Sequence, residues 1–369
     1  MSADAQKKPL RVVRCMTAVV VSLLLLALCL SVPTWASQES PKGLPPAWIE
    51  FPIIQGQIAH VDVYEQTVTW SQGAWSGLPP PCTQTETTLA ELDWDICLYD
   101  TQTGEMTDTM SIGNMNQWPR LDGDWLVWRR GFKSRSVLAK NLVTGQEITL
   151  PRDPIVPQPD TPNIHGPLVV YRDFAVLPPD YDLAEKIVAY DLMSQQFITI
   201  TVSLDYYVNY PDVYSETVVW QQAPTATLDF DIVGYDLSSQ NVFTISARPG
   251  NELYPRIDGS VVVWDWNGDI FGYDLDAGRR LTITQAAGTQ TWPAVSGNLV
   301  VWMDDRNDGQ WDIYAYDLAT GQEEQVTDSS IDEGWPAVWG NLVVWDAEDT
   351  GVYAARRMTS FRFMPLVRR

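Results

Sequence analysis

The chain has 369 residues, of which 45% are hydrophobic and 11% aromatic, and its 24 Lys and Arg against 47 Asp and Glu give a formal net charge of −23. Such an acidic field repels phosphate backbones, which argues against nucleic acid as a partner. Solubility explains the acidic surplus, and cationic ligands or divalent cations are the functional alternative.

Residues 1–36 are predicted to be an export signal. A basic stretch ending at Arg14 precedes the apolar run Met16–Leu30, and Pro33 comes just before Thr34–Ala36, which resembles a small-x-small cleavage site. We expect a cleaved signal and an extracellular or cell-envelope protein. The alternative is an uncleaved anchor helix, because the apolar run approaches the length that spans a bilayer. Only in that case would the chain contact a membrane.

Without this signal, Cys82 and Cys97 are the two cysteines of the mature chain. An exported protein meets an oxidising environment, so the pair is predicted to form a disulfide. Closing a loop of this size would contribute about 3 kcal/mol in the chain-entropy model. The alternatives are two free thiols or an incomplete metal site, for which no nearby Cys or His pair supplies the other ligands.

The mature chain contains an internal repeat, which is clearest between Trp292 and Asp328. Hydrophobic period and Gly, Asn and Asp turns predict four short strands in this copy: Ala294–Val295, Leu299–Trp302, Asp312–Tyr316 and Glu323–Thr327. Four antiparallel strands in a repeat of roughly forty residues are typical of a β-propeller blade.

Seven copies end their second strand with an aromatic residue: Trp70, Trp128, Tyr171, Trp220, Trp264, Trp302 and Trp345. We therefore predict an all-β fold, a seven-bladed β-propeller of four-stranded antiparallel blades over residues 57–369. The blades are expected to begin near residues 57, 117, 160, 209, 253, 291 and 334. No separate second domain fits this division.

The recurring residues have structural explanations. The closing aromatics are expected to fill the space between neighbouring blades, where large flat side chains bury the most area. A Tyr-Asp pair recurs downstream, as at Tyr316-Asp317, and its Asp is expected to cap a turn.

The last blade needs a fourth strand, and the sequence leaves two sources open. Residues 351–363 can be laid over the third and fourth strands of the preceding copy. Alternatively Trp48–Ile54, in the N-terminal segment 37–56, supplies the outer strand, where Pro52 is tolerated because an outer strand is an edge.

The clearest copy resembles the repeat of TolB-like proteins and related prokaryotic cell-surface propellers. The resemblance is most specific from Asp305 to Tyr314, which reads D-R-x-D-G-x-W-D-I-Y with Asn307 and Gln310 at the two variable positions. It implies an exported, non-catalytic propeller that acts through protein contacts. TolB-type propellers have six blades and a separate N-terminal domain, whereas this chain has seven copies and none, so the surface-protein branch is the closer match.

Few residues carry an obvious chemistry. His60 and His165 are the only histidines, and no G-x-S-x-G elbow is present, which argues against a serine hydrolase. No cofactor is predicted, with calcium as a weak possibility. Asp265, Asn267 and Asp269 have oxygen ligands at calcium-loop spacing, but a plain hairpin turn explains them equally well.

One position in the repeat is a candidate ligand site. An aromatic residue precedes the repeated proline in five copies, while His60 and Thr161 stand there in the other two, and two arginines directly follow the proline. In a propeller this junction leads to the innermost strand, so these side chains could stack on sugars or hold a peptide at the channel mouth. The alternative is that each aromatic packs on its own proline and the next blade. The candidates are Trp118, Tyr210, Tyr254, Trp292, Trp335, Arg120 and Arg256.

From these observations the sequence predicts an exported, non-catalytic binding or scaffolding protein whose partner is a protein or a cell-surface glycan. The alternative is a polysaccharide-active enzyme, hydrolase or lyase, with carboxylates in the channel. That alternative requires charged side chains that break the repeat and converge at one mouth.

Overall fold

The structure is a computed structural model, and it describes residues 48–56, 58–73, 94–108, 115–156, 158–180, 182–307, 309–347 and 350–358. The predicted export signal lies outside these residues. Within them every regular element is a β-strand, and no helix is long and apolar enough to cross a membrane.

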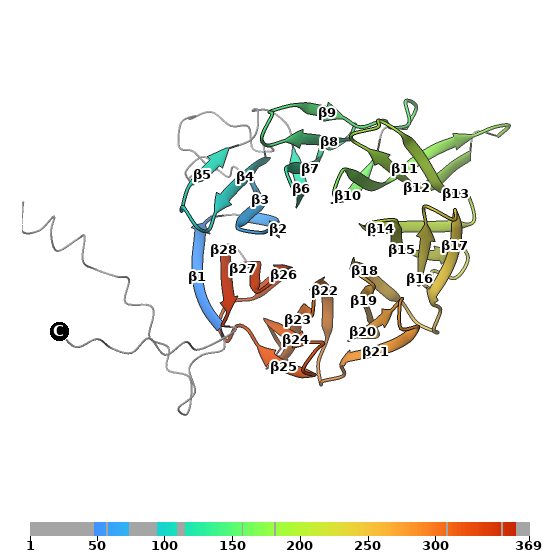
Figure 1. Cartoon of the computed structure of the whole chain (residues 1–369). Helices are drawn as coiled ribbons and strands as arrows, with labels where there is room; N and C mark the ends of the chain where they lie inside the picture. The colour runs from blue at the N-terminus through green and yellow to red at the C-terminus, as the bar shows by residue number, and fades with distance from the viewer. Residues whose placement is uncertain are drawn as a thin grey trace, which may run out of the picture. The chain divides into compact units, whose positions relative to one another are not determined.

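Seven four-stranded antiparallel sheets stand around a ring, as predicted (Figure 1). The first three blades are formed by β2 (Ile58–Tyr64), β3 (Thr67–Gly73), β4 (Trp94–Asp100) and β5 (Met106–Asp108); by β6 (Asn116–Asp122), β7 (Trp125–Arg130), β8 (Ser136–Asn141) and β9 (Glu147–Thr149); and by β10 (Asp160–His165), β11 (Leu168–Leu177), β12 (Asp182–Asp191) and β13 (Phe197–Ser203).

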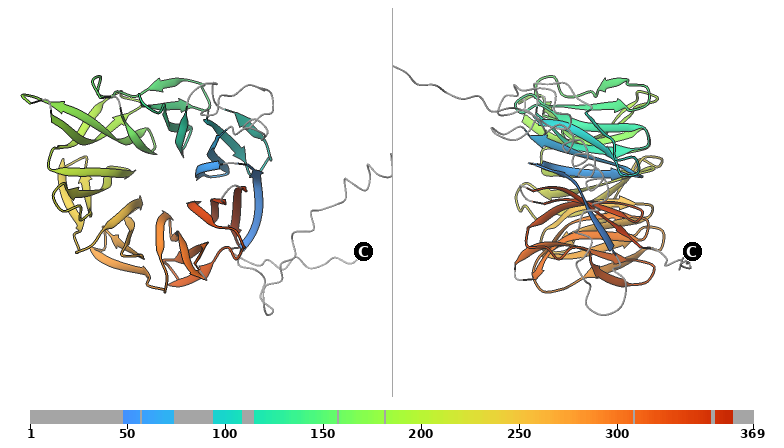
Figure 2. Two further views of the ribbon diagram at one scale, coloured as in Figure 1. Left: turned by 180° about the vertical axis from the view of Figure 1, so that it is seen from behind. Right: turned by 90° about the vertical axis from the view of Figure 1, so that its left-hand side faces the viewer.

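The next three blades continue the pattern around the ring (Figure 2). They are formed by β14 (Tyr206–Tyr214), β15 (Thr217–Pro224), β16 (Asp231–Asp236) and β17 (Asn241–Ser246); by β18 (Glu252–Asp258), β19 (Val261–Trp266), β20 (Asp269–Asp274) and β21 (Arg279–Thr284); and by β22 (Gln290–Ser296), β23 (Leu299–Asn307), β24 (Gln310–Asp317) and β25 (Gln322–Gln325).

The seventh blade is completed by the N-terminal segment. It consists of β26 (Glu333–Trp339), β27 (Leu342–Ala347), β28 (Gly351–Arg357) and, as its outer strand, β1 (Trp48–Gln55). In the antiparallel β1–β28 ladder, Trp48 lies opposite Arg357 and Gln55 opposite Gly351. The Trp48 indole N–H also donates to Glu324 of the sixth blade, at 3.0 Å. Of the two closures left open by the sequence, the structure contains the second.

The hydrophobic core lies between the blades. Buried side chains form seven clusters, and each cluster joins two neighbouring blades. The predicted closing aromatics are central to it, since none of the seven is more than 2% exposed. Burial of this kind stabilises by about 1.5–3 kcal/mol for each large apolar side chain. The blades are therefore held rigidly against one another.

The predicted turn caps are present on the outer hairpins. Asp317 accepts backbone N–H bonds from Ala319 and Thr320, at 2.9 and 3.0 Å. Asp100 and Asp191 do the same at the corresponding turns, and Asn141 takes this place in the second blade. The Asp after the recurring tyrosine is thus architectural, as expected.

The innermost strands differ from the prediction. In the clearest copy the first strand begins at Gln290 rather than at Ala294, because its ladder to β23 continues past an irregularity between Thr291 and Ala294. The same irregularity, three positions on the innermost strand against two on its partner, occurs in all the other innermost strands. These bulges determine which side chains enter the channel.

Candidate functional site

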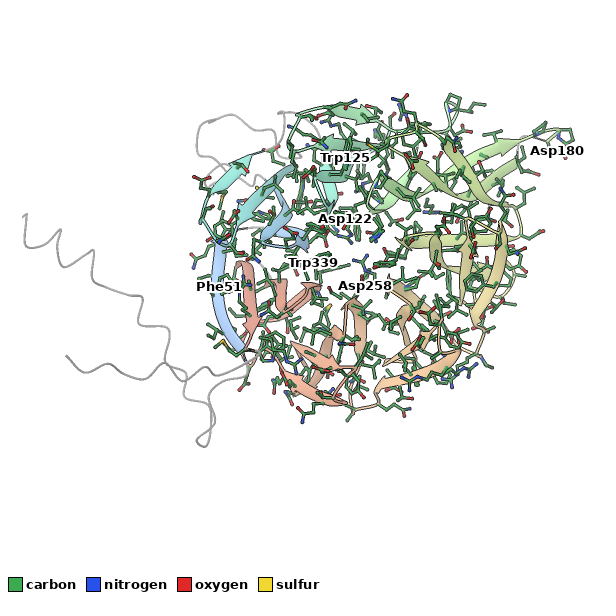
Figure 3. All side chains as sticks on the ribbon, in the orientation of Figure 1. Phe51, Asp122, Trp125, Asp180, Asp258 and Trp339 are labelled. Atoms are coloured by element: carbon green, nitrogen blue, oxygen red, sulfur yellow. The ribbon has the colours of Figure 1, made fainter. Side chains whose placement is uncertain are left out.

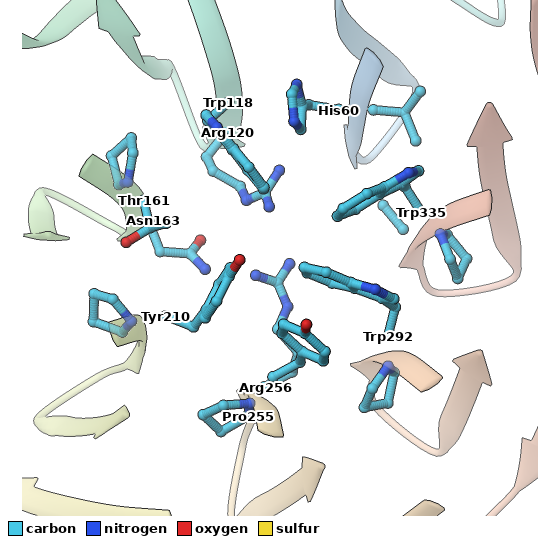
Figure 4. A pocket seen from close by; sticks show the side chains of 17 residues that line it. His60, Trp118, Arg120, Thr161, Asn163, Tyr210, Pro255, Arg256, Trp292 and Trp335 are labelled. Atoms are coloured by element: carbon cyan, nitrogen blue, oxygen red, sulfur yellow. The ribbon is translucent and has the colours of Figure 1, made fainter. Parts of the chain in front are cut away.

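The residue before the repeated proline lies in the left-handed region in six blades, and so does His60, which precedes Val61 in the first blade. The φ angles of His60, Trp118, Thr161, Tyr210, Tyr254, Trp292 and Trp335 are between 47° and 58°. Such values are uncommon for residues other than glycine, and a residue before proline normally prefers an extended backbone. Each of these residues sits in the bulge of its innermost strand, and bulges re-aim side chains. Here they aim the side chains into the channel (Figure 4).

The aromatic side chains at these positions meet one another. Trp292 stacks on Tyr254 with 3.6 Å between ring centroids and lies 4.1 Å from Trp335. His60 lies 3.8 Å from Trp118, and Tyr210 contacts Tyr254 at 4.9 Å. The structure therefore brings all five aromatic candidates into a single pocket of about 660 Å³, which is partly open to solvent. Each of these contacts joins rings from neighbouring blades.

A second layer of residues lies two positions after each bulged residue. This position does not repeat: it holds Asp62, Arg120, Asn163, Asp212, Arg256, Ala294 and Ala337. Arg120, Asn163, Arg256 and Ala337 line the aromatic pocket. Asp62, Asp212 and Ala294 line a second pocket, which shares Asn163, Arg256 and Ala337 with the first. Figure 4 shows both guanidinium groups near the middle of the ring. Five polar side chains thus occupy one side of the channel and two alanines leave space on the other.

The carboxylates of this layer accept hydrogen bonds from the backbone of the next blade. Asp62 accepts the Leu121 N–H at 2.8 Å, and Asp212 accepts the Ile257 N–H at 2.9 Å. The two N–H donors, Leu121 and Ile257, directly follow Arg120 and Arg256 in the sequence. The Asp212 carboxylate also lies 3.8 Å from the Arg256 guanidinium group. Burial raises the pKa of Asp62, although Arg120 and Arg256 lower it. Asp62 and Asp212 are residues that the sequence reasoning did not single out.

Burial also shifts the basic groups of the pocket. It lowers the pKa of Arg120 to about 10, with repulsion from Arg256 acting in the same direction. It lowers the pKa of His60 to about 3, helped by the charges of Arg120 and Arg129, so this imidazole is neutral near pH 7. His60 Nδ1 is buried and has no hydrogen-bond partner within the described part of the chain. Burial raises the pKa of Tyr210 to about 12, so its hydroxyl stays protonated.

The opposite mouth of the channel is lined by the last residues of the innermost strands. Asp122 accepts the Gly166 N–H, Asp258 accepts the Gly297 N–H, and Ser296 accepts the Gly340 N–H at 3.1 Å. Each bond links one blade to the turn of the next. Figure 3 places Asp122, Asp258 and Trp339 around the centre of the ring. These acidic residues serve blade contacts, so we assign no ligand to this mouth.

The calcium candidates form a two-residue hairpin turn. Trp266 pairs directly with Asp269, and the intervening Asn267 and Gly268 have φ angles of 54° and 83°, which fits a type I′ turn. The buried Asp265 carboxylate accepts the Thr291 hydroxyl of the next blade. Among the described residues no group of three or more His, Cys, Asp and Glu side chains is arranged to hold a metal ion.

The predicted disulfide falls partly outside the described residues. Cys97 is fully buried in β4, within the cluster that joins the first and seventh blades. Cys82 is not among the described residues. The pairing of these two cysteines stays a prediction.

Asp265 leads to a prediction of pH-dependent stability. Burial raises its pKa from 3.8 to about 7, so the folded chain holds a proton that the unfolded chain releases. The free energy of unfolding should fall as the pH rises from about 4 to about 7. Asp265→Asn should remove part of this slope and stabilise the protein at pH 8 by up to about 4 kcal/mol.

Urea unfolding of both proteins at several pH values measures this effect. Asp276→Asn is the matched control, because Asp276 is exposed on a turn of the same blade. Glu333 and Asp346, whose pKa values burial also raises to about 7, should keep part of the slope in the Asp265 variant. Identical pH profiles for wild type and Asp265→Asn would contradict the prediction.

Comparison with known proteins gives structural relatives only. No protein-family model and no curated protein sequence matches the chain. The fold matches an oligogalacturonate lyase from Vibrio parahaemolyticus at 11% identity, with a TM-score of 0.59 over 85% of this chain and 93% of that one. An oligogalacturonate lyase in complex with manganese is 16% identical, with a TM-score of 0.54 over 72% of this chain and 83% of that one.

A peptidase propeller is similar to the same degree. Pyrococcus horikoshii acylaminoacyl peptidase matches at 9% identity, with a TM-score of 0.59 over 85% of this chain and 54% of that one. The chain thus spans about half the length of this peptidase. At such identities the similarity establishes the propeller fold, and the resemblance to TolB-like repeats is not confirmed by it.

These matches correct the main functional prediction. The sequence favoured a non-catalytic binding or scaffolding protein, but the solved structures that share the fold are enzymes, a lyase and peptidases among them. The non-catalytic prediction is therefore not kept, and at 9–16% identity the matches themselves establish only the fold.

Proposed function

We propose that the protein is an exported polysaccharide-active enzyme that cleaves an acidic saccharide in the aromatic pocket by β-elimination. The observation that carries this proposal is the arginine pair below the aromatic ring. Arg120 and Arg256 present positive charge in an otherwise acidic protein, at the end of a pocket whose walls can stack on sugar rings. The oligogalacturonate lyases that share the fold give independent support for a saccharide substrate.

The arginines suit a uronate in particular. A uronate carboxylate paired with guanidinium groups has less negative charge, and the hydrogen on the adjacent C5 becomes more acidic. In β-elimination the C5–H bond breaks, a C4=C5 double bond forms, and the C4–O bond of the glycosidic linkage breaks. The proton from C5 goes to a base, and the leaving oxygen takes up a proton. No oxidant or reductant is required.

His60 is the proposed base and Tyr210 the proposed acid. His60 is neutral, and the described residues give its Nδ1 no partner. A carboxylate bound beside it would raise this low pKa toward the range that suits a general base. The Tyr210 hydroxyl remains protonated and lines the same pocket, so it can donate to the leaving oxygen.

Elimination fits the channel better than hydrolysis by paired carboxylates. Glycoside hydrolysis needs one carboxyl group as acid and a second as base or nucleophile. The two carboxylates of the second layer, Asp62 and Asp212, are buried and already accept backbone N–H bonds from the next blade. The arginines, in contrast, project into the pocket (Figure 4).

The test is incubation of the secreted mature protein with uronate oligosaccharides and with the same oligosaccharides after reduction of their carboxyl groups. We expect ultraviolet absorbance from the new C4=C5 bond with the acidic substrates only. His60→Gln should retain binding and lose turnover by on the order of 10²-fold or more. Binding of acidic saccharides without any unsaturated product from the wild-type protein would rule out the elimination.

A further inference from the structure

A cluster of basic side chains lies beside the aromatic pocket. Six of the 24 Lys and Arg residues fall between positions 129 and 152, where Glu147 is the one acidic residue. Four of them, Arg129, Lys133, Arg135 and Arg152, are named here the basic rim. A local positive surplus is notable in a chain whose net charge is −23.

The basic rim begins at the pocket wall. Arg129 lies opposite Gln117 in the β6–β7 ladder, directly beside the bulged Trp118. It bonds Asp160 at 2.8 Å, and Asp160 immediately precedes Thr161, which lines the pocket. The charge of Arg129 reaches the pocket itself, since it contributes to the low pKa of His60.

From there the basic rim runs outward along the boundary of the second and third blades. Arg135 forms an ion pair with the other oxygen of Asp160. Arg152 donates to the Arg135 carbonyl and, at 3.1 Å, to the Ser134 hydroxyl, so backbone and hydroxyl oxygens hold it in place. Lys133 is exposed on the same loop between β7 and β8.

The positive charge of the basic rim is only partly balanced. Asp160 is shared by Arg129 and Arg135, and the Asp153 carboxylate accepts backbone N–H bonds from Ile155 and Val156. Within the described part of the chain, Lys133 and Arg152 form no ion pair. Two cationic side chains are therefore available to a ligand on the face where the pocket opens.

We infer that the basic rim is a second anion subsite that binds the part of an acidic polysaccharide extending out of the channel pocket. This inference deepens the proposed function and rests on it for the identity of the ligand. The pocket is enclosed by the aromatic rings of neighbouring blades and is partly open to solvent, so a longer chain has to leave it. A polyanion that passes Thr161 meets the basic rim next, and its carboxylates are complementary in charge to Lys133 and Arg152.

The test compares chain lengths by isothermal titration calorimetry, with a polyuronate of defined length and the corresponding disaccharide as probes. The variant is Lys133→Ser with Arg152→Ser, and the matched control is Arg279→Ser with Arg280→Ser, two exposed residues of the outer strand β21. We expect the variant to lose about five- to tenfold in affinity for the polyuronate and to bind the disaccharide as before. The loss should shrink at high salt.

The outcomes separate the inference from the proposed function. Equal wild-type affinities for both chain lengths, or an unchanged affinity of the variant, would overturn the subsite. Binding of duplex DNA that also depends on Lys133 and Arg152 would overturn the acidic polysaccharide as its ligand. Length-dependent binding of polyuronate without production of unsaturated sugars would support the subsite while refuting the elimination.

Discussion

Replacing Arg256 with alanine is expected to lower kcat/KM for an acidic saccharide by on the order of 10²- to 10³-fold. The reason is that elimination builds negative charge on the uronate carboxylate, and a guanidinium group placed beforehand in a desolvated pocket stabilises it. Arg256 is suited to this because Asp212 lies 3.8 Å from its Nε and also bonds the Ile257 N–H. Initial rates on uronate oligosaccharides measure the effect.

Two further variants identify the origin of that loss. Arg279→Ala removes the same charge from an exposed outer strand and should leave kcat/KM unchanged. Asp212→Asn retains an oxygen acceptor for the Ile257 N–H but removes the charge beside Arg256, so it should cost less than the arginine variant. Circular dichroism must show that each protein is folded. Full activity of a folded Arg256→Ala protein would exclude the arginine from the reaction.

Deletion of β1 is expected to destabilise the propeller by about 5 kcal/mol or more. The deletion removes the buried Trp48 together with Phe51, Ile53 and Ile54, which pack on the cores beside the seventh blade. It also exposes β28 as a new edge. A loss of this size is comparable to the whole stability of many domains.

The experiment compares chains that begin at Gly56 and at Ala47 in urea unfolding. The second chain lacks residues 1–46 but keeps β1, so it controls for truncation itself. A synthetic peptide covering Trp48–Gln55 should raise the stability of the shorter chain, because it can restore the β28 ladder and the Trp48 bond to Glu324. Equal stability of the two chains would show that β1 does not close the ring.

The sequence was sufficient to predict the architecture because the same short sequence pattern recurs in every blade. The closing aromatics and turn-capping Asp residues each predicted one structural contact, and the structure contains those contacts in blade after blade. Closure by Trp48–Gln55 could not be chosen from the sequence, since it depends on pairing between segments some 300 residues apart, Trp48 with Arg357. Short sequence patterns do not show which distant segments of the chain pair with each other.

The residues that line the channel were predicted only in part. The five aromatics and two arginines were found from their place around the proline, but Asp62, Asn163 and Asp212 were not. These three residues occupy the repeat position that directly follows the proline, or Val61 in the first copy. The residue type at this position changes from blade to blade, and the sequence reasoning overlooked that variation. The bulge itself was beyond sequence reasoning, because a left-handed residue before proline runs against the local backbone preference. Tertiary contacts between neighbouring blades impose it.

The β1–β28 ladder also bears on how the chain can be reconnected. Because Trp48 lies opposite Arg357, the first and last strands run side by side in one sheet, and a short designed linker could join them. New ends could then be opened at an outer turn such as that at Ala319–Gly321, which lies in an exposed hairpin. The order of the blades along the chain is thus separable from their order around the ring, and circular permutation becomes a practical route for engineering this propeller.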